Sequence, residues 1–300
     1  MHLNVWMYVY RMLEVAVDQC TPDCIACNDG AVRSWDGALA FYVGSLEGEA
    51  GDLSAGVFPH NQADKRCHNF LTCGPKGGES SGAALVNHNI MRMMQEGQSK
   101  LLMGDCDLRD HVRAIVAQMS IPLIQGTLRY AEIMARTGDR QPSNPAKAAA
   151  EGISFAAAIV PRIAACKDGG GDAETIWNNM KHGATSTNYG AVKGALEKHY
   201  GCLNISCAEV GGFYDHSNQR YNPNSEPCKD PSGWLNLSNE AIIGICVGGG
   251  MATLLMCCAC CCVWQLIRRE KKGTPMFMPL TISPNQNSSA RGVALSTPSC

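Results

Sequence analysis

Charged side chains are scarce in this chain of 300 residues, where they make up 17%, and the formal net charge is only −2. Proteins that bind nucleic acid through its phosphates carry an excess of basic residues, so this balance argues against a nucleic-acid partner. The sequence also lacks an H-E-x-x-H helix, a P-loop, a nucleophile elbow and a pair of C-x-x-C motifs. Because such motifs supply a nucleophile, a phosphate cradle or a metal-activated water, we predict that the chain is not an enzyme.

Charge is absent altogether from residues 241–267, AIIGICVGGGMATLLMCCACCCVWQLI. A helix of roughly 20 apolar residues spans a bilayer, and this run is longer. Basic residues follow at once in RREKK (268–272), and basic residues mark the cytoplasmic end of a span. We predict a single-pass type I protein of the plasma membrane, with residues 1–240 extracellular, a transmembrane helix over 241–267 and a cytoplasmic tail over 268–300. A buried core helix is the alternative interpretation.

Two features of the predicted span bear on partners and modification. Gly244, Gly248 and Ala252 recur at four-residue steps, a pattern that lets two helices approach closely and pair as a homodimer. Glycine-rich spans also occur without pairing. A cluster of cysteines near the cytoplasmic end is typical of palmitoylation, with simple apolar packing as the alternative; its members are Cys257, Cys258, Cys260, Cys261 and Cys262.

The stretch CTPDCIAC, Cys20 to Cys27, has the C-x3-C-x2-C spacing that holds an iron–sulfur cluster in radical enzymes. Such a cluster needs a reducing compartment and usually an aromatic residue before the third cysteine, where this chain has Ala26. Ten cysteines precede the predicted span, and an even set in an oxidising compartment forms disulfides. We therefore predict disulfides, with their connectivity open. Sequons at Asn204 and Asn236 are predicted glycosylation sites and agree with an extracellular region.

The first residues, MHLNVWMYVYRMLEVAV, contain no basic n-region and no small-residue cleavage site. Because a type I topology needs a signal peptide, we expect that the sequence lacks its true start. The alternative is a C-terminal span that inserts unaided, which would leave the sequons and the cysteines before the span in the cytoplasm.

Apolar residues recur at three- and four-residue steps through most of the region before the span, and strand-like alternation is absent. We predict an all-α, disulfide-braced ectodomain over residues 1–210, followed by a stalk rich in Asn, Ser, Pro and Gly over 211–240. Pro122 predicts a break between two helices. A faint repeat raises the hypothesis of two four-helix units, although alanine-rich helices also align by chance. The expected helices are 31–48, 82–103, 107–119, 123–138, 145–160, 172–183 and 188–201.

Oxygen-donor side chains on these helices are the candidates for chemistry. Hard cations such as ferric iron favour carboxylate and phenolate ligands, and helices present such ligands inward in bundle-type iron sites. The candidates are Asp36, Tyr42, Glu47, Tyr130 and Glu151. A solvated surface is the alternative for the acids, core packing is the alternative for Tyr42, and no spacing among them specifies a metal. An accompanying anion such as carbonate is left open, and the basic residues available to bind it are Lys65, Arg66 and Arg129.

Three blocks of sequence stand out: AVRSWDGALAFYVGSLEG (31–48), ADKRCHNFLTC (63–73) and KAAAEGISFAAAIVPRIAAC (147–166). Together they resemble the Fe-assimilating domain of algae, the family of low-iron-inducible periplasmic iron-assimilation proteins of green algae. The resemblance covers about residues 5–215 of the chain. It implies a secreted or surface protein that raises iron uptake at low supply by binding ferric iron and handing it to a transporter or to endocytosis.

The resemblance implies that the acidic residues of the matching blocks, Asp36, Glu47 and Glu151, are ligand candidates, with Tyr42 beside them. Tyr130 is a candidate only from the pattern of the sequence itself. Unlike the periplasmic members of the family, this chain has a predicted span, which implies a membrane-anchored form. One alternative is a metal-free helical adhesion or scaffold ectodomain. Another is an ectoenzyme such as a surface ferric reductase or peptidase, for which the sequence shows no flavin, haem or catalytic zinc motif.

Overall fold

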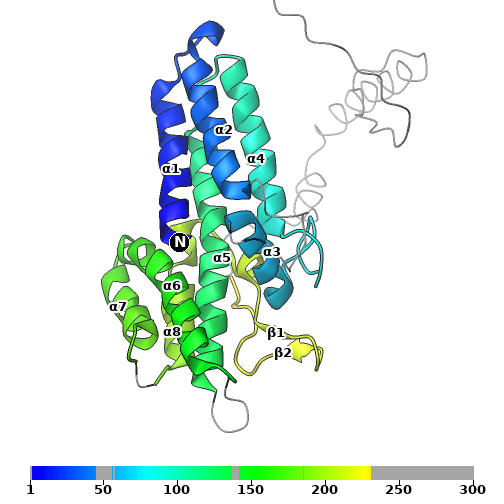
Figure 1. Ribbon diagram of the computed structural model, residues 1–300, viewed down its shortest axis with the longest axis vertical. Helices are drawn as coiled ribbons and strands as arrows, with labels where there is room; N and C mark the ends of the chain where they lie inside the picture. The colour runs from blue at the N-terminus through cyan, green and yellow to red at the C-terminus, as the bar shows by residue number, and fades with distance from the viewer. Residues whose placement is uncertain (1, 45–55, 57, 137–141, 185, 231–300) are drawn as a thin grey trace, which may run out of the picture. The chain divides into compact units, whose positions relative to one another are not determined.

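The computed structural model describes residues 2–44, 56, 58–136, 142–184 and 186–230 (Figure 1). They fall in one compact unit, Met1–Ser232, and a second unit, Gly233–Cys300, lies outside them. The described part is predominantly helical, as predicted. Its elements are α1 (His2–Gln19), η1 (Ile25–Cys27), α2 (Asp29–Val43), α3 (Pro59–Phe70), α4 (Leu85–Leu102), α5 (Arg109–Ala135), α6 (Pro145–Ala164), α7 (Gly169–Met180), α8 (Tyr189–Glu197), α9 (Tyr200–Leu203), α10 (Cys207–Val210), β1 (Tyr214–Asp215) and β2 (Arg220–Tyr221).

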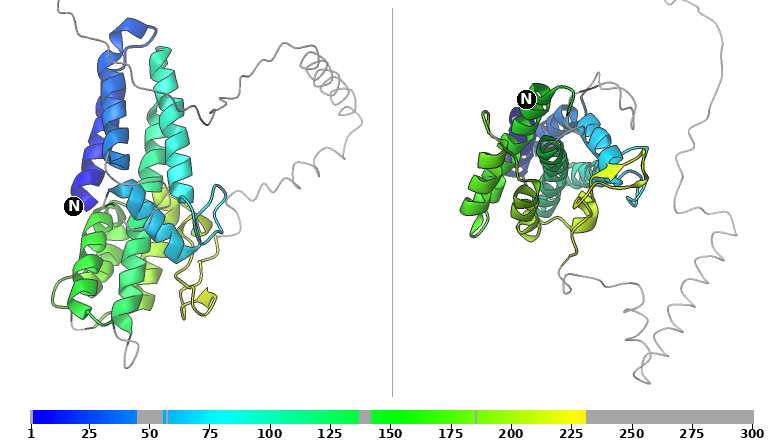
Figure 2. Two further views of the ribbon diagram at one scale, coloured as in Figure 1. Left: turned by 45° about the vertical axis from the view of Figure 1, so that its right-hand side comes forward. Right: turned by 90° about the horizontal axis from the view of Figure 1, so that it is seen from below.

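Helix α5 is the axis of the unit. Helices α1, α2 and α4 lie along its first half, and α6, α7 and α8 lie around its second half (Figures 1 and 2). Every residue from 117 to 128 is buried, because the helix is packed on all sides there. The two groups of helices therefore share α5. Two four-helix units, as the faint repeat suggested, would have this helix in common.

The predicted helix break at Pro122 is wrong, because α5 continues through it. Proline has no amide hydrogen, so the helix loses the bond to the Gln118 carbonyl, and a proline inside a helix costs about 3 kcal/mol. The apolar side chains that surround this turn are buried on all sides, and that burial outweighs the cost.

Two glycines let helices approach closely. A Cβ atom at Gly97 of α4 would lie 2.1 Å from Trp35 Cζ2 of α2, and one at Gly126 of α5 would lie 2.4 Å from Phe155 Cδ1 of α6. The indole nitrogen of Trp35 also donates a hydrogen bond to the Met94 carbonyl at 2.8 Å. Glycine at these two positions therefore gives each large ring a place against the neighbouring helix.

Five disulfides brace this unit and use all ten cysteines that precede residue 230, as predicted. The CTPDCIAC stretch is divided between two of them, so the iron–sulfur interpretation is wrong. The bond from Cys20 to Cys106 joins the end of α1 to the segment before α5. The other pairs are Cys24–Cys27, Cys67–Cys73, Cys166–Cys202 and Cys207–Cys228.

Residues 211–230, the first part of the predicted stalk, pack against the helices. Strands β1 and β2 pair antiparallel within this segment, and the buried ring of Phe213 lies 5.7 Å from that of Phe70 in α3. A segment rich in Asn, Ser, Pro and Gly is thus held against the helices by a disulfide and an aromatic contact.

The remaining C-terminal predictions fall outside the described residues: the rest of the stalk, the span over 241–267, the tail over 268–300, the sequon at Asn236, the pairing face of Gly244, Gly248 and Ala252, and the cysteine cluster at 257–262. Within the described residues, no helix combines the length and the apolar character needed to cross a bilayer.

Candidate functional site

Two of the predicted ligand candidates meet in the structure. The phenol of Tyr130 on α5 donates a hydrogen bond to Glu151 Oε2 on α6. Gly152 makes this approach possible, because a Cβ atom there would lie 3.0 Å from Tyr130 Cβ. A phenol and a carboxylate from separate helices thus lie next to each other, and ferric iron prefers oxygen ligands of both kinds.

Two arginines cover the Tyr130 ring. The guanidinium carbon of Arg129 lies 4.8 Å from the ring centroid, and that of Arg66 on α3 lies 5.9 Å from it and 5.6 Å from the Phe155 centroid. Arg66 is only 8% exposed. Its Nε and Nη1 atoms, and Nε of Arg129, are buried with no hydrogen-bond acceptor among the described residues.

The two guanidinium groups carry a charge that burial disfavours. Loss of solvent, followed by the nearby charge of Arg129, lowers the pKa of Arg66 to about 9, while Glu151 opposes the shift. Burial also lowers the pKa of Arg129 from its ordinary value. Buried polar groups are normally paired, so these unpaired N–H groups mark a place for an additional anion.

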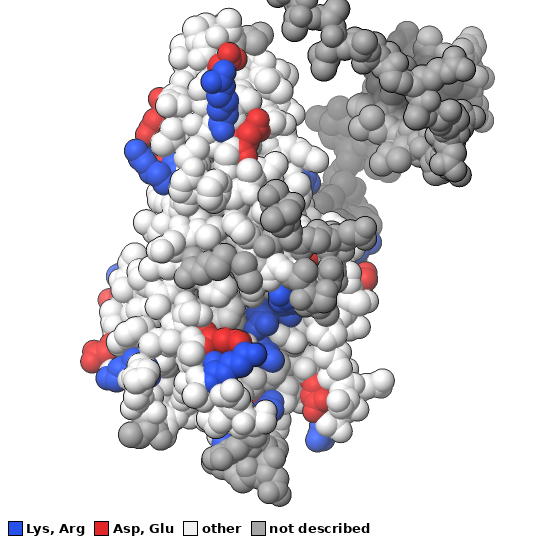
Figure 3. Space-filling view, in the orientation of Figure 1, with Lys and Arg blue, Asp and Glu red and all other residues white. Residues whose placement is uncertain are grey.

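The charge balance around Glu151 is positive. The exposed Lys147 places its Nζ 3.8 Å from Glu151 Oε1. Together with Arg66 and Arg129, it brings the number of basic side chains near this carboxylate to three. Figure 3 shows basic side chains next to acidic ones on the lower half of the face that it draws. An oxyanion bound to the arginines would be held by charge-assisted hydrogen bonds, which are about twice as strong as neutral ones.

Tyr42 belongs to a different hydrogen-bond network. Its phenol donates to Asn87 Oδ1 at 2.5 Å, and Asn87 Nδ2 donates to Asp64 Oδ1 at 2.7 Å and to the His60 carbonyl at 2.9 Å. Burial, followed by the charge of Asp64, raises the pKa of the Tyr42 phenol. The phenol therefore keeps its proton and connects α2 to α4, which makes it a poor ligand for a metal.

The other candidates are spread over the surface or lie beyond the described part. Asp36 is exposed on α2 and accepts a hydrogen bond from Gln98 Nε2 at 2.7 Å. Glu47 lies outside the described residues. Lys65 points away from the arginines, since its Nζ donates to the Gly56 carbonyl at 2.7 Å. Of the predicted set, the structure brings together Tyr130, Glu151, Arg66 and Arg129.

The aromatic side of this site has no counterpart among the predicted residues. The ring of His2 stacks on that of Phe155 at 4.4 Å, and Phe155 stacks with Tyr130 at 6.0 Å. His2 and Phe155 come from α1 and α6, and their spacing carries no signal. Among the described residues, no group of three or more His, Cys, Asp and Glu is placed to hold a metal. A ferric site here would instead depend on the Tyr130 phenolate.

The sequon asparagine Asn204 is exposed at the C-terminal end of α9. Its φ is 57°, a left-handed conformation that asparagine tolerates better than most residues. The hydroxyl of Ser206 in the same sequon caps α10 by accepting a hydrogen bond from the Glu209 amide at 3.2 Å. The position leaves room for a glycan, and glycosylation there stays a prediction.

No family model, curated protein or solved structure matches this chain. The resemblance to the algal iron-assimilation domain therefore stays a prediction from the three sequence blocks.

Proposed function

We propose that this protein binds ferric iron at the cell surface for high-affinity iron assimilation and delivers it to a transporter or to endocytosis. The observation that carries the proposal is the meeting of the Tyr130 phenol and the Glu151 carboxylate beside two arginines with unpaired N–H groups. The resemblance of the three sequence blocks to iron-assimilation proteins supports the same conclusion.

In this proposal the iron is cargo, and Tyr130 and Glu151 are its protein ligands. Binding displaces the phenol proton to solvent, which leaves a phenolate and a carboxylate as two negative donors. Ferric iron then adds three positive charges next to Arg66 and Arg129. This arrangement is stable only with a further anion, so we propose that an oxyanion such as carbonate binds the arginines together with the iron.

The proposed location is the extracellular face of the plasma membrane. Five disulfides in the described part fit an oxidising compartment. The uncharged run 241–267, followed by basic residues, supports a type I anchor, and a transporter in the same membrane is the proposed recipient of the iron.

The test is a ferric titration of the full chain with its disulfides intact, in the presence and absence of bicarbonate, followed by absorbance and metal analysis. We expect one iron per chain with a phenolate-to-iron band. Tyr130→Phe removes the band, and the matched control Tyr42→Phe keeps it, because Tyr42 hydrogen-bonds Asn87 instead. If the chain retains no iron above a metal-free control under either condition, the proposal fails and the metal-free scaffold alternative takes its place.

A further inference from the structure

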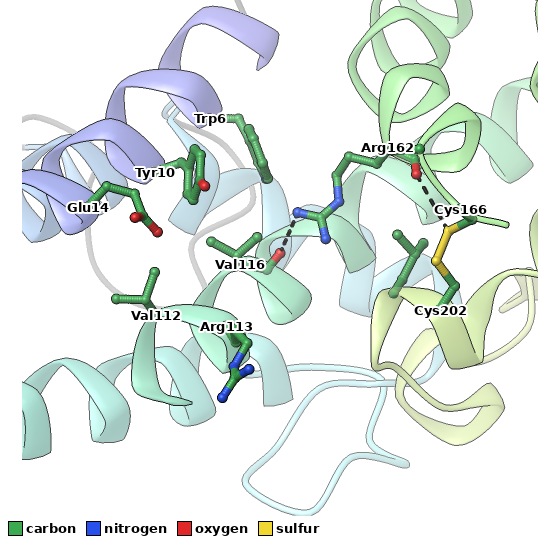
Figure 4. A pocket seen from close by; sticks show the side chains of 11 residues that line it. Trp6, Tyr10, Glu14, Val112, Arg113, Val116, Arg162, Cys166 and Cys202 are labelled. Carbon is green, nitrogen blue, oxygen red and sulfur yellow. Dashed lines mark hydrogen bonds between the residues drawn. A yellow bond between two sulfur atoms is a disulfide. The ribbon is translucent and has the colours of Figure 1, made fainter. Parts of the chain in front are cut away.

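A cavity separate from the proposed iron site lies between α1, α5, α6 and α9, with a volume of about 420 Å³ (Figure 4). Small-molecule sites occupy about 300–1,000 Å³, so the cavity has room for a compact ligand. Its walls are mostly apolar and include Trp6, Val112, Val116, Leu203 and the Cys166–Cys202 disulfide. None of the residues of the proposed iron site lines it.

Three charged side chains line this cavity, and two of them already have partners. Glu14 Oε2 accepts a hydrogen bond from Arg109 Nη1 at 3.2 Å. Arg113 is exposed and pairs with Asp110 one turn earlier on α5. Arg162 has no carboxylate partner among the described residues, so it alone brings an uncompensated charge to the cavity.

Arg162 is held in place by its surroundings. Its guanidinium carbon lies 5.0 Å from the Trp6 ring centroid, and its Nη1 donates to the Val116 carbonyl at 3.3 Å. Its Nε is buried without an acceptor among the described residues. Figure 4 shows the guanidinium beside the Trp6 ring, with the hydrogen bond to the Val116 carbonyl. Burial lowers the pKa of Arg162, and the phenol of Tyr10 opposes that shift.

We propose that this cavity binds a small organic monocarboxylate with a flat, apolar body. The carboxylate of the ligand pairs with Arg162. It thereby supplies the negative charge that no described carboxylate of the protein provides. The apolar body lies against Trp6 and the valines of α5. A second carboxylate is disfavoured because Glu14 lines the same cavity. This site is independent of iron, since it uses neither Tyr130 nor Glu151.

The test compares benzoate with benzamide, which has the same shape and no charge, by calorimetric titration of the full chain without iron. Benzoate binds, and benzamide binds roughly tenfold or more weakly, because a hydrogen-bonded ion pair is lost. Arg162→Gln lowers benzoate affinity to the level of benzamide, and Arg162→Lys keeps part of it. Arg92→Gln is the matched control and changes the affinity by less than about twofold, since Arg92 is an exposed group that pairs with Glu96 and does not line this cavity.

Several outcomes overturn the proposal. These are the absence of benzoate binding, equal affinity for benzamide, and unchanged benzoate affinity in Arg162→Gln. If Arg162→Gln fails to fold, the comparison of the two ligands on the unaltered chain decides. The indole N–H resonance of Trp6 provides a second readout, since a ligand beside Arg162 shifts it and a ligand bound elsewhere does not.

Discussion

The phenol of Tyr130 donates a hydrogen bond to the carboxylate of Glu151, and this bond joins α5 to α6. The two side chains come from parts of the sequence that are 21 residues apart. In the proposed iron site the phenol proton leaves to solvent, and the phenolate and the carboxylate remain as two anionic donors on adjacent helices. The proposed iron site therefore predicts separate effects for changes at Tyr130 and at Glu151.

Glu151→Gln separates the two contributions. The amide is a much weaker ligand for a hard cation, so we expect ferric affinity to decrease by about 10–100-fold or more. The phenolate-to-iron band persists at saturating iron because Tyr130 is unchanged. Affinity is measured by competition with a chelator. Lys147→Gln is the control, since the lysine is exposed and lies 3.8 Å from the same carboxylate. Equal losses in the two variants would contradict a ligand role for Glu151.

Arg66→Met is expected to move stability and iron binding in opposite directions. The buried guanidinium has unpaired N–H groups, so its replacement by an apolar side chain of similar length stabilises the iron-free protein by about 1–3 kcal/mol. The same change weakens anion binding and removes the increase in ferric affinity that bicarbonate produces. Urea unfolding and ferric titration at several bicarbonate concentrations measure the two effects.

The neighbouring residue supplies the control for this prediction. Lys65→Met also removes one positive charge from α3, but Lys65 contacts the Gly56 carbonyl and not the site. It leaves the bicarbonate dependence unchanged. A parallel loss of bicarbonate dependence in both variants would mean that only the total charge matters, and the proposed anion contact of Arg66 would be wrong.

The disulfides of the CTPDCIAC stretch are expected to differ in their effect on stability. The bond Cys20–Cys106 closes a separation of 86 residues, and Cys24–Cys27 closes one of 3. A longer loop has more conformational entropy to lose, so the chain-entropy estimate gives about 4–5 kcal/mol for the first bond and about 2 kcal/mol for the second. Paired replacement by alanine, followed by urea unfolding, measures both. Equal losses would contradict the entropic account.

Local patterns in the sequence predicted local structure well. The apolar stripe predicted over 31–48 corresponds to α2 up to Val43, with residues 45–48 outside the described part, and the proline at position 145 begins α6 as expected. Pro122 misled the prediction because the cost of a proline is local, whereas the burial that offsets it comes from helices distant in sequence. A propensity rule contains no information about those helices.

The candidate site shows the same limit. Tyr130 and Glu151 were identifiable as oxygen donors, but their meeting depends on how α5 crosses α6, and that crossing depends on Gly126 and Gly152. The sequence offered Lys65 and Arg66 equally, and only the helix orientation separates the buried residue from the one that points away. Asp36 was attractive by its place in a sequence block, yet the structure places it at an exposed position.

Asp172 gives a prediction about pH. Lys198 Nζ and His199 Nε2 each lie 2.9 Å from its carboxylate and join α7 to the end of α8, and the hydrogen bonds from both hold the pKa of Asp172 below its ordinary value. A lowered carboxyl pKa adds stability above the unfolded pKa of about 4, and that contribution is lost as the pH falls through the folded pKa.

Asp172→Asn therefore destabilises the protein at pH 7 and not at pH 2. Because solvent screens this pair, we expect about 0.5–1 kcal/mol at pH 7, or roughly 1–4 °C in melting temperature. Thermal unfolding of both proteins at the two pH values measures the difference. Asp110→Asn is the control, since that carboxylate pairs with Arg113 at an exposed position and its loss changes little. A difference that persists undiminished at pH 2 would mean that the asparagine disturbs packing, and the charge of Asp172 would then not be the cause.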